Sequence, residues 1–249
     1  MEQLHGQSIV VLDLETRKSA DDCMHCGQPF ETCHQTHYGA AGGHSYEKIG
    51  WENKLALGLS IGCYWDYQDG ALHWFDCATL WTTLLRFNLP KPLLVSFNGI
   101  SFDFALMRAL LRYEGRSGQA QMFPTEAPPS ENVRTLACDQ FKALCTTSYD
   151  LLREIWKIDP QNKFGRGLNS LDALCQANGL PLKEMDGATA PRLWAQGRYA
   201  EVIGYNVGDV LRTKALFEMV CQGKPILRGN GLPIQLPLPA GIAAEEPGS

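Results

Sequence analysis

Three short segments of the chain carry carboxylates beside apolar runs. The first run, SIVVLDLE, leads into Asp13 and Glu15; the second, LLVSFNGISFD, ends at Asp103; the third, YNVGD, ends at Asp209. Each lies at an element boundary or on a helix face that suits a common cleft. Four acidic side chains in one cleft repel each other and resist ionising, unless divalent cations neutralise them. The sequence therefore predicts a metal-binding cleft.

Short β-rich runs alternate with helical patterns along most of the chain. Strands are expected at 8–14, at 55–63, where alternate positions are apolar, at 71–75 after a turn at 68–70, and at 93–97. Helices are expected at 78–88, 102–113, 132–144, 168–178 and 199–221. This alternation predicts an α/β fold, a mixed sheet flanked by helices.

One domain is expected over 1–222, with a Cys/His-rich insert at 17–54 and a Pro/Gly-rich C-terminal tail at 223–249. Hydrophobic residues make up 45% and charged residues 20%, as in folded soluble proteins. No leader sequence or membrane span is recognised, so a cytoplasmic protein is expected. The net charge of −5 argues against a broadly basic surface, but it leaves nucleic acid open as a substrate.

The spacing within each segment allows its polar side chains to act together. Asp13 and Glu15 are two residues apart on a strand and share a face. Tyr205 and Asp209 are four apart on a helix and share a face. Each segment alone also has an ordinary explanation: surface charge, a helix-start aspartate at Asp103, or a hydrogen bond between tyrosine and carboxylate. Their joint occurrence in this order favours an active site.

With these motifs the sequence resembles the DEDD superfamily of 3′–5′ exonucleases, which includes proofreading domains of DNA polymerases and has a ribonuclease-H-like fold. The resemblance spans roughly residues 8–221. The matching residues of its three motifs are, in order, Asp13 with Glu15, Asn98 with Asp103, and Asp209. Tyr205 stands four residues before Asp209, which is similar to the tyrosine subclass.

The resemblance implies hydrolysis of the terminal phosphodiester bond of single-stranded nucleic acid, with DNA favoured over RNA, and release of nucleoside monophosphates. It implies two Mg²⁺ or Mn²⁺ ions, held by Asp13, Glu15, Asp103 and Asp209. Tyr205 would orient the attacking water, and Asn98 and Phe102 would line the substrate channel. Asp150, in SYDLL, is a secondary candidate and is better explained as scaffold.

The insert gathers four of the six histidines and three of the nine cysteines. Cys23 and Cys26 have the spacing of a zinc knuckle, and Cys33 with His37, or His34 as the alternative, could complete a structural zinc site. His44 lies further on, and spacing does not decide which histidine is the ligand. A flexible loop with free thiols is the other interpretation. The insert follows Glu15 directly, so we expect it near the active site, contacting the incoming strand or a partner protein.

Two rival functions remain open. One is a non-catalytic nucleic-acid or protein-binding module on the same fold. Mutually repelling carboxylates destabilise a site that has no catalytic use for them, and this argues against such a module. The other is a structure-specific endonuclease. The sequence contains no polymerase or helicase domain, so a role in proofreading or DNA repair would need a separate polymerase or repair partner.

Overall fold

A five-stranded mixed sheet forms the centre of the molecule. The computed structural model describes residues 4, 8–37, 43–87, 91–112, 130–163, 167–183, 185 and 187–242, without the side chains at 37, 112, 131, 133 and 134. The sheet has the order β3-β2-β1-β4-β5 and is built from β1 (Ile9–Thr16), β2 (Leu59–Asp66), β3 (Ala71–Phe75), β4 (Leu93–Ser96) and β5 (Tyr149–Asp150). β1, β4 and β5 are parallel, and β2 is antiparallel to both its neighbours. This arrangement confirms the predicted α/β, ribonuclease-H-like fold.

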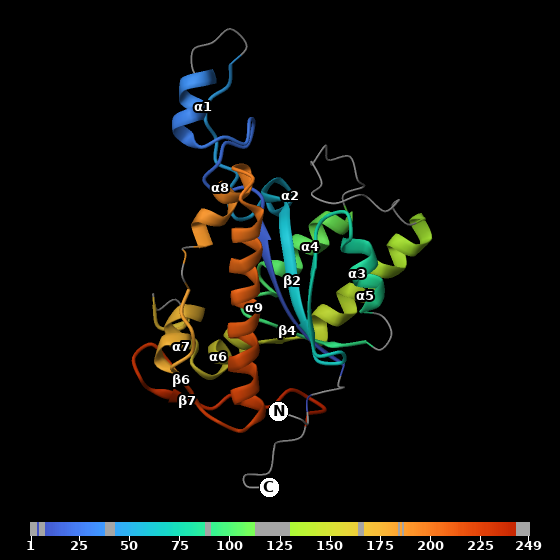
Figure 1. The fold of residues 1–249 in the computed structure, drawn as a ribbon, viewed down its shortest axis with the longest axis vertical. Helices are drawn as coiled ribbons and strands as arrows, with labels where there is room; N and C mark the ends of the chain where they lie inside the picture. Colours follow the sequence, from blue (N-terminus) through green and yellow to red (C-terminus); the bar gives the residue numbers. More distant parts are fainter. Residues whose placement is uncertain are drawn as a thin grey trace.

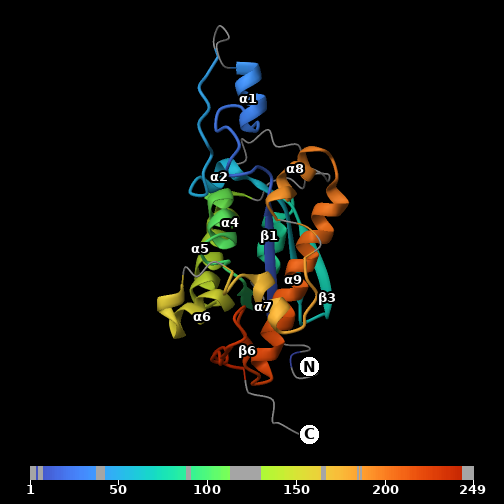
Figure 2. The ribbon, with the colours of Figure 1, turned by 90° about the vertical axis from the view of Figure 1, so that its left-hand side faces the viewer.

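Helices cover both faces of the sheet (Figures 1 and 2). The long helix α9 (Tyr199–Cys221) crosses β1 and β2 on one face, accompanied by α6 (Leu151–Ile158), α7 (Leu171–Ala177) and α8 (Ala190–Ala195). The other face carries α3 (Leu80–Arg86), α4 (Asp103–Arg112) and α5 (Glu131–Thr147). In the described ranges, no helix is both long and apolar enough to cross a membrane.

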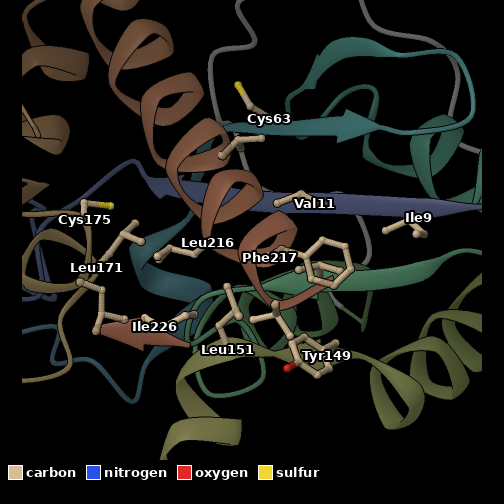
Figure 3. Packing of buried hydrophobic residues seen from close by; sticks show 14 of the residues in the cluster. Ile9, Val11, Cys63, Tyr149, Leu151, Leu171, Cys175, Leu216, Phe217 and Ile226 are labelled. Carbon is tan, nitrogen blue, oxygen red and sulfur yellow. The ribbon is translucent and has the colours of Figure 1, made fainter. Parts of the chain in front are cut away.

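Alternation along β1 divides the apolar core into two clusters. Ile9 and Val11 pack with α9, and Figure 3 shows Phe217 and Leu216 of that helix beside Val11. Val10, Leu12 and Leu14 belong to the opposite cluster, which contains side chains of α3, α4 and α5. Successive strand residues point to opposite faces, so the odd-numbered positions of β1 all face α9. Asp13 and Glu15 are at odd-numbered positions.

The strand expected to begin at residue 55 begins later. Leu55 and Leu57 lie in a short helix, α2 (Lys54–Leu57), and β2 starts at Leu59. The Asn53 side chain caps this helix by accepting a hydrogen bond from the Ala56 backbone N–H at 3.2 Å. Gly58 then takes a positive φ of 66°, which a residue with a side chain rarely adopts. Capping chemistry therefore overrides the strand-like alternation of this segment.

Several helix boundaries also differ from expectation. The helix expected from residue 168 starts at Leu171, because the Ser170 side chain accepts a hydrogen bond from the Ala173 N–H at 3.2 Å and so fixes the N-terminus. Ser130 precedes α5 but makes no such bond. The short helices α1 (Phe30–His37), α6 and α8 were not predicted. Of the expected surface loop at 115–130, all but the last residue lies outside the described residues.

Residues 223–242 run along the body of the protein. They contain a short antiparallel pair, β6 (Ile226–Leu227) and β7 (Pro233–Ile234). Ile226, Ile234 and Leu236 are buried in the α9-side cluster, and the Tyr149 hydroxyl donates a 2.8 Å hydrogen bond to the Pro237 carbonyl. This part of the predicted tail packs as a strap against the core.

Candidate active site and metal centre

The end of β1 presents two carboxylates to α9. In the antiparallel pairing with β2, Asp13 lies opposite Cys63 and Glu15 opposite Ile61, and both of these partners belong to the cluster that packs with α9. The register shifts between Glu15 and Thr16, so regular pairing ends directly after the second carboxylate. Burial of the apolar odd-numbered positions therefore fixes the direction in which Asp13 and Glu15 point.

Helix α9 contributes the third carboxylate and its neighbours. Tyr205, Asn206, Asp209 and Arg212 are buried, and each of the other three lies three or four residues from Asp209, so all four are on one side of the helix. The Asn206 amide donates a 2.6 Å hydrogen bond to Asp13 Oδ2. One carboxylate oxygen each from Asp13, Glu15 and Asp209 lie within 4.8 Å of one another. The structure thus brings together carboxylates from opposite ends of the chain.

The fourth carboxylate stands at the first turn of α4. Before it, Asn98 adopts a positive φ of 65°, and its backbone N–H donates to Asp150 Oδ1 at 2.9 Å, while the Ile100 N–H donates to Asp150 Oδ2 at 3.0 Å. Gly99 is required here, since a Cβ would lie 2.4 Å from Ser96 Oγ. This turn holds Asp103, whose residue is 3% exposed, at the edge of the site.

The carboxylates perturb one another strongly. Burial, followed by repulsion from Asp103 and Asp209, raises the pKa of Asp13 well above its ordinary value. Burial and the charge of Asp209 do the same to the pKa of Glu15. Burial, and then the neighbouring Asp150, raise the pKa of Asp103 to about 7. Full ionisation of this group therefore requires compensating positive charge.

Two cations already pair with Asp209. Lys183 Nζ lies 3.1 Å from Asp209 Oδ2, and the buried Arg212 guanidinium pairs with the other oxygen. Lys183 also donates a 2.7 Å hydrogen bond to the Tyr205 hydroxyl. Burial raises the pKa of Tyr205 above its ordinary value and outweighs the opposing effect of this lysine. Tyr205 therefore remains a protonated hydroxyl at neutral pH.

Sequence reasoning did not identify Lys183, Asn206 or Arg212. The last two stand three residues before and after Asp209, and that helical spacing was a usable signal. Lys183 lies in an irregular segment without periodicity, so its place beside Tyr205 follows only from the fold. Asp150 was named as scaffold, and its hydrogen bonds to the turn that precedes Asp103 agree with that role.

The acidic group has the chemistry of a site for hard divalent cations. Carboxylate oxygens are the donors that Mg²⁺ and Mn²⁺ prefer. The raised pKa values of Asp13 and Glu15 indicate a shortage of positive charge that a bound cation would supply. Asp103 is not within the 4.8 Å group, but its charge acts on both of them. The residues present therefore fit divalent metal.

The two predicted substrate-channel residues lie together beside Asp103. Asn98 and Phe102 line one hollow with Trp51, Lys54 and Ser101. The Phe102 side chain is partly buried against a small cluster at the base of the insert, formed by Ala20, Ile49 and Leu57. Both residues thus lie in the turn that leads into Asp103, the first residue of α4.

A second group, in the insert, has ligands of a different kind. One atom each from Cys23, Cys26, Cys33 and His44 lie within 4.8 Å of one another. His34, the alternative in our prediction, is exposed on α1 next to Phe30 and is not part of this group. The side chain of His37 lies outside the described residues. Among the described histidines, the fold therefore brings His44 to the thiols.

Comparison with protein families gives evidence on the function of the carboxylate group. The profile of a family described as a predicted 3′–5′ exonuclease related to the exonuclease domain of PolB matches residues 78–225. The chain belongs to this exonuclease family. A search of curated proteins found no match.

The matched region of the exonuclease family contains the second and third motifs but starts after β1. Asp103, Tyr205 and Asp209 lie within it, whereas Asp13 and Glu15 lie outside. The fold itself brings Asp13 and Glu15 to Asp209. Family membership supports nuclease activity in general and hence a nucleic-acid substrate, and exonucleases of this kind generally use divalent metals.

Proposed function

We propose that the protein is a metal-dependent 3′–5′ exonuclease of the tyrosine subclass, which removes nucleoside monophosphates from the 3′ end of single-stranded nucleic acid. The observation that carries the proposal is the convergence of Asp13 and Glu15 from β1 with Asp209 from α9, their oxygens within 4.8 Å of one another. Asp103 adds a fourth carboxylate that interacts electrostatically with this group. The relation of the family to the exonuclease domain of PolB favours DNA over RNA as the substrate.

Asp13, Glu15, Asp103 and Asp209 would hold two Mg²⁺ or Mn²⁺ ions. Such ions lower the pKa of an attacking water and stabilise charge on the leaving 3′ oxygen. The protein's own contribution is to orient these carboxylates. Asn206 holds one oxygen of Asp13, and Arg212 holds one oxygen of Asp209. These contacts limit the freedom of each carboxylate and so pre-organise the site.

Tyr205 acts by positioning rather than by taking a proton. Its raised pKa keeps the hydroxyl protonated, so it can donate a hydrogen bond but is a poor general base at neutral pH. Lys183 restrains this hydroxyl through the 2.7 Å hydrogen bond and pairs with Asp209 at the same time. Lys183 therefore couples the orientation of Tyr205 to a proposed metal ligand.

The direct test is digestion of single strands labelled at either end, as DNA and as RNA, with Mg²⁺, with Mn²⁺ or with EDTA. We expect a metal-dependent ladder that shortens from the 3′ end and releases monophosphates. Asp209→Ala should abolish it. Asp139→Ala, a matched substitution at an exposed position on α5, should leave it unchanged.

The rival functions give different results in the same assay. An endonuclease would cut a circular strand or a strand with a blocked 3′ end. A binding module would retain the strand but leave it intact under every metal condition. Either outcome would contradict the proposed exonuclease.

A further inference from the structure

The four residues of the Cys/His group surround one point in the insert. His44 Nε2 lies 3.5 Å from Cys23 Sγ and 3.6 Å from Cys33 Sγ, and Cys26 completes the group. Cys23 and Cys33 are buried although the surrounding segment is mostly exposed. Four protein ligands around one centre leave no position open for a substrate, as in structural zinc sites.

The backbone around Cys23 forms a tight knuckle. The Gly27 N–H donates to the Cys23 carbonyl at 2.7 Å, and the Cys23 N–H donates to the Gln28 carbonyl at 2.8 Å. The backbone N–H groups of Cys26, Glu47 and His25 donate hydrogen bonds to the Cys23 sulfur. Backbone donors aimed at a sulfur stabilise the thiolate form, which is the form that binds metal.

Apart from the cysteines, the described residues of the insert bury few apolar side chains. Ala20 and Ile49 form a small buried apolar cluster with Leu57 of α2, and this cluster lies at the base of the insert near the sheet. Figures 1 and 2 show α1 at the far end of the long axis, beyond α2 and α8. A segment with so few apolar contacts gains stability from a bound metal instead.

We propose that Cys23, Cys26, Cys33 and His44 bind one structural Zn²⁺ ion. Soft thiolates combined with an imidazole favour zinc over the hard cations expected at the carboxylates. The ion links the knuckle at one end of the insert to the chain that returns through His44. It thereby fixes the isolated antiparallel bridge between Cys23 and Lys48, and so the point at which the chain re-enters the body.

The test is the zinc content of the whole protein purified under reducing conditions and passed over a weak chelator. We expect one zinc per chain, and a cobalt-exchanged sample with thiolate-to-metal absorption. Cys33→Ser and His44→Ala should each lose the ion, whereas Cys145→Ser, a cysteine on α5, should keep it. Wild-type protein without zinc would overturn the proposal even if the variants failed to fold. Full zinc content in His44→Ala would overturn this ligand set.

A separate observation concerns the surface where the insert returns to the body. The Trp51 residue is 60% exposed, and its ring lies edge-on to Phe102 with centroids 5.7 Å apart. Lys54 Nζ lies 4.2 Å from the Phe102 ring centroid and donates a 2.5 Å hydrogen bond to the Trp51 carbonyl. An exposed tryptophan and a lysine are thus held together on one aromatic side chain.

This pair lies beside the turn that leads into Asp103. With Asn98, Ser101 and Phe102 it lines a hollow of about 430 Å³. Residue 102 directly precedes Asp103, whose negative charge acts on Lys54. A flat ring beside a cation is the combination that binds single-stranded nucleic acid without sequence preference: bases stack on the ring and the cation contacts phosphate.

We infer that Trp51 and Lys54 bind the single strand next to its 3′-terminal nucleotide, Trp51 by stacking on a base and Lys54 by contacting a phosphate. This inference rests on the proposed exonuclease function, since it places the strand that the carboxylates would cut. It gives the insert a role in substrate binding through residues outside the family match, which begins at residue 78. Base-edge recognition is not involved, so affinity should be similar for strands of different sequence.

The test measures the affinity of a fluorescent single-stranded DNA by anisotropy, in the inactive Asp209→Ala protein. Trp51→Ala should weaken binding roughly tenfold. The logarithm of the affinity falls as the logarithm of the salt concentration rises. Lys54→Ala should make this slope shallower by about 0.7, the change expected for the loss of one phosphate contact. Trp74→Ala, which removes a tryptophan that is 47% exposed on β3, should change neither value. In the active enzyme, Trp51→Ala should raise KM and leave kcat within about twofold of the wild type.

The outcomes separate this inference from the proposed function. If the wild type shortens strands from the 3′ end but Trp51→Ala leaves affinity and KM unchanged, the surface does not bind the strand, and a protein partner becomes the remaining explanation for it. If no metal condition gives cleavage, the proposed function fails. Weaker single-strand binding by Trp51→Ala would in that case still support the binding surface, and unchanged binding would refute it.

Discussion

Removing the negative charge of Asp103 should stabilise the metal-free protein at neutral and higher pH. Its pKa rises from 3.8 to about 7 on folding, through burial and the charge of Asp150. Between these pH values the folded chain binds more protons than the unfolded chain, so the free energy of unfolding falls as pH rises. The slope is about 1.4 kcal/mol per pH unit, and the total loss above pH 7 is at most about 4 kcal/mol.

Asp103→Asn keeps the shape of the protonated acid and cannot ionise. In EDTA, we expect it to match the wild type near pH 4 and to exceed the wild type by about 2 to 4 kcal/mol at pH 8. Millimolar Mg²⁺ should stabilise the wild type at pH 8 and remove most of this advantage. Activity should be lost in the variant, because the asparagine no longer supplies an anionic oxygen to the metals.

The measurement is urea-induced unfolding of both proteins in EDTA across this pH range. Asp159→Asn is the control of opposite sign, since the hydrogen bonds from Asn162 and Arg228 lower the pKa of Asp159 and stabilise the fold above its unfolded-state pKa. That variant should be less stable than the wild type at neutral pH. If Asp103→Asn were instead less stable than the wild type by the same amount at pH 5 and pH 8, the argument from mutual repulsion would be refuted.

Three further substitutions test how the site is held. Tyr205→Phe should lower kcat on the order of 100-fold with little change in KM, because the water loses its orienting hydroxyl; equal rates would exclude that role. Gly187→Ala would place a Cβ 2.6 Å from the Tyr205 hydroxyl, so activity should fall while unfolding in urea stays near the wild type. Asp150→Ala should lower the free energy of unfolding by about 3 kcal/mol, because it leaves the part-buried N–H groups of Asn98 and Ile100 and the buried N–H of Leu152 without their acceptor; an unchanged midpoint would contradict this.

The sheet and the long helix could be predicted from the sequence because the positions of their hydrophobic residues agree with the faces that are buried in the fold. The continuous apolar, β-rich run of β1 and the apolar face of α9 indicated both elements, and the bounds of α9 were predicted to the residue. The segment at 55–63 shows the limit of that reasoning. Its alternation is strand-like, but the side chain of Asn53 and the positive φ of Gly58 determine a helical turn.

The candidate site was predictable in its carboxylates and less so in its supporting contacts. Spacing of two on a strand and four on a helix indicated Asp13 with Glu15 and Tyr205 with Asp209. Lys183 comes from an irregular segment, and only packing places such a residue. The histidine of the insert was undecided for a related reason, because loop conformation rather than sequence separation brings His44 to the cysteines.

The most direct test of the central claim is the product series from a 5′-labelled single strand in Mg²⁺. Strands with a free 3′ hydroxyl and with a blocked 3′ end should be compared in the wild type and in Asp103→Asn. The account predicts stepwise shortening from the free end by the wild type, and neither shortening of the blocked strand nor activity in the variant. Equal cleavage of both strands, or undiminished activity in Asp103→Asn, would contradict it.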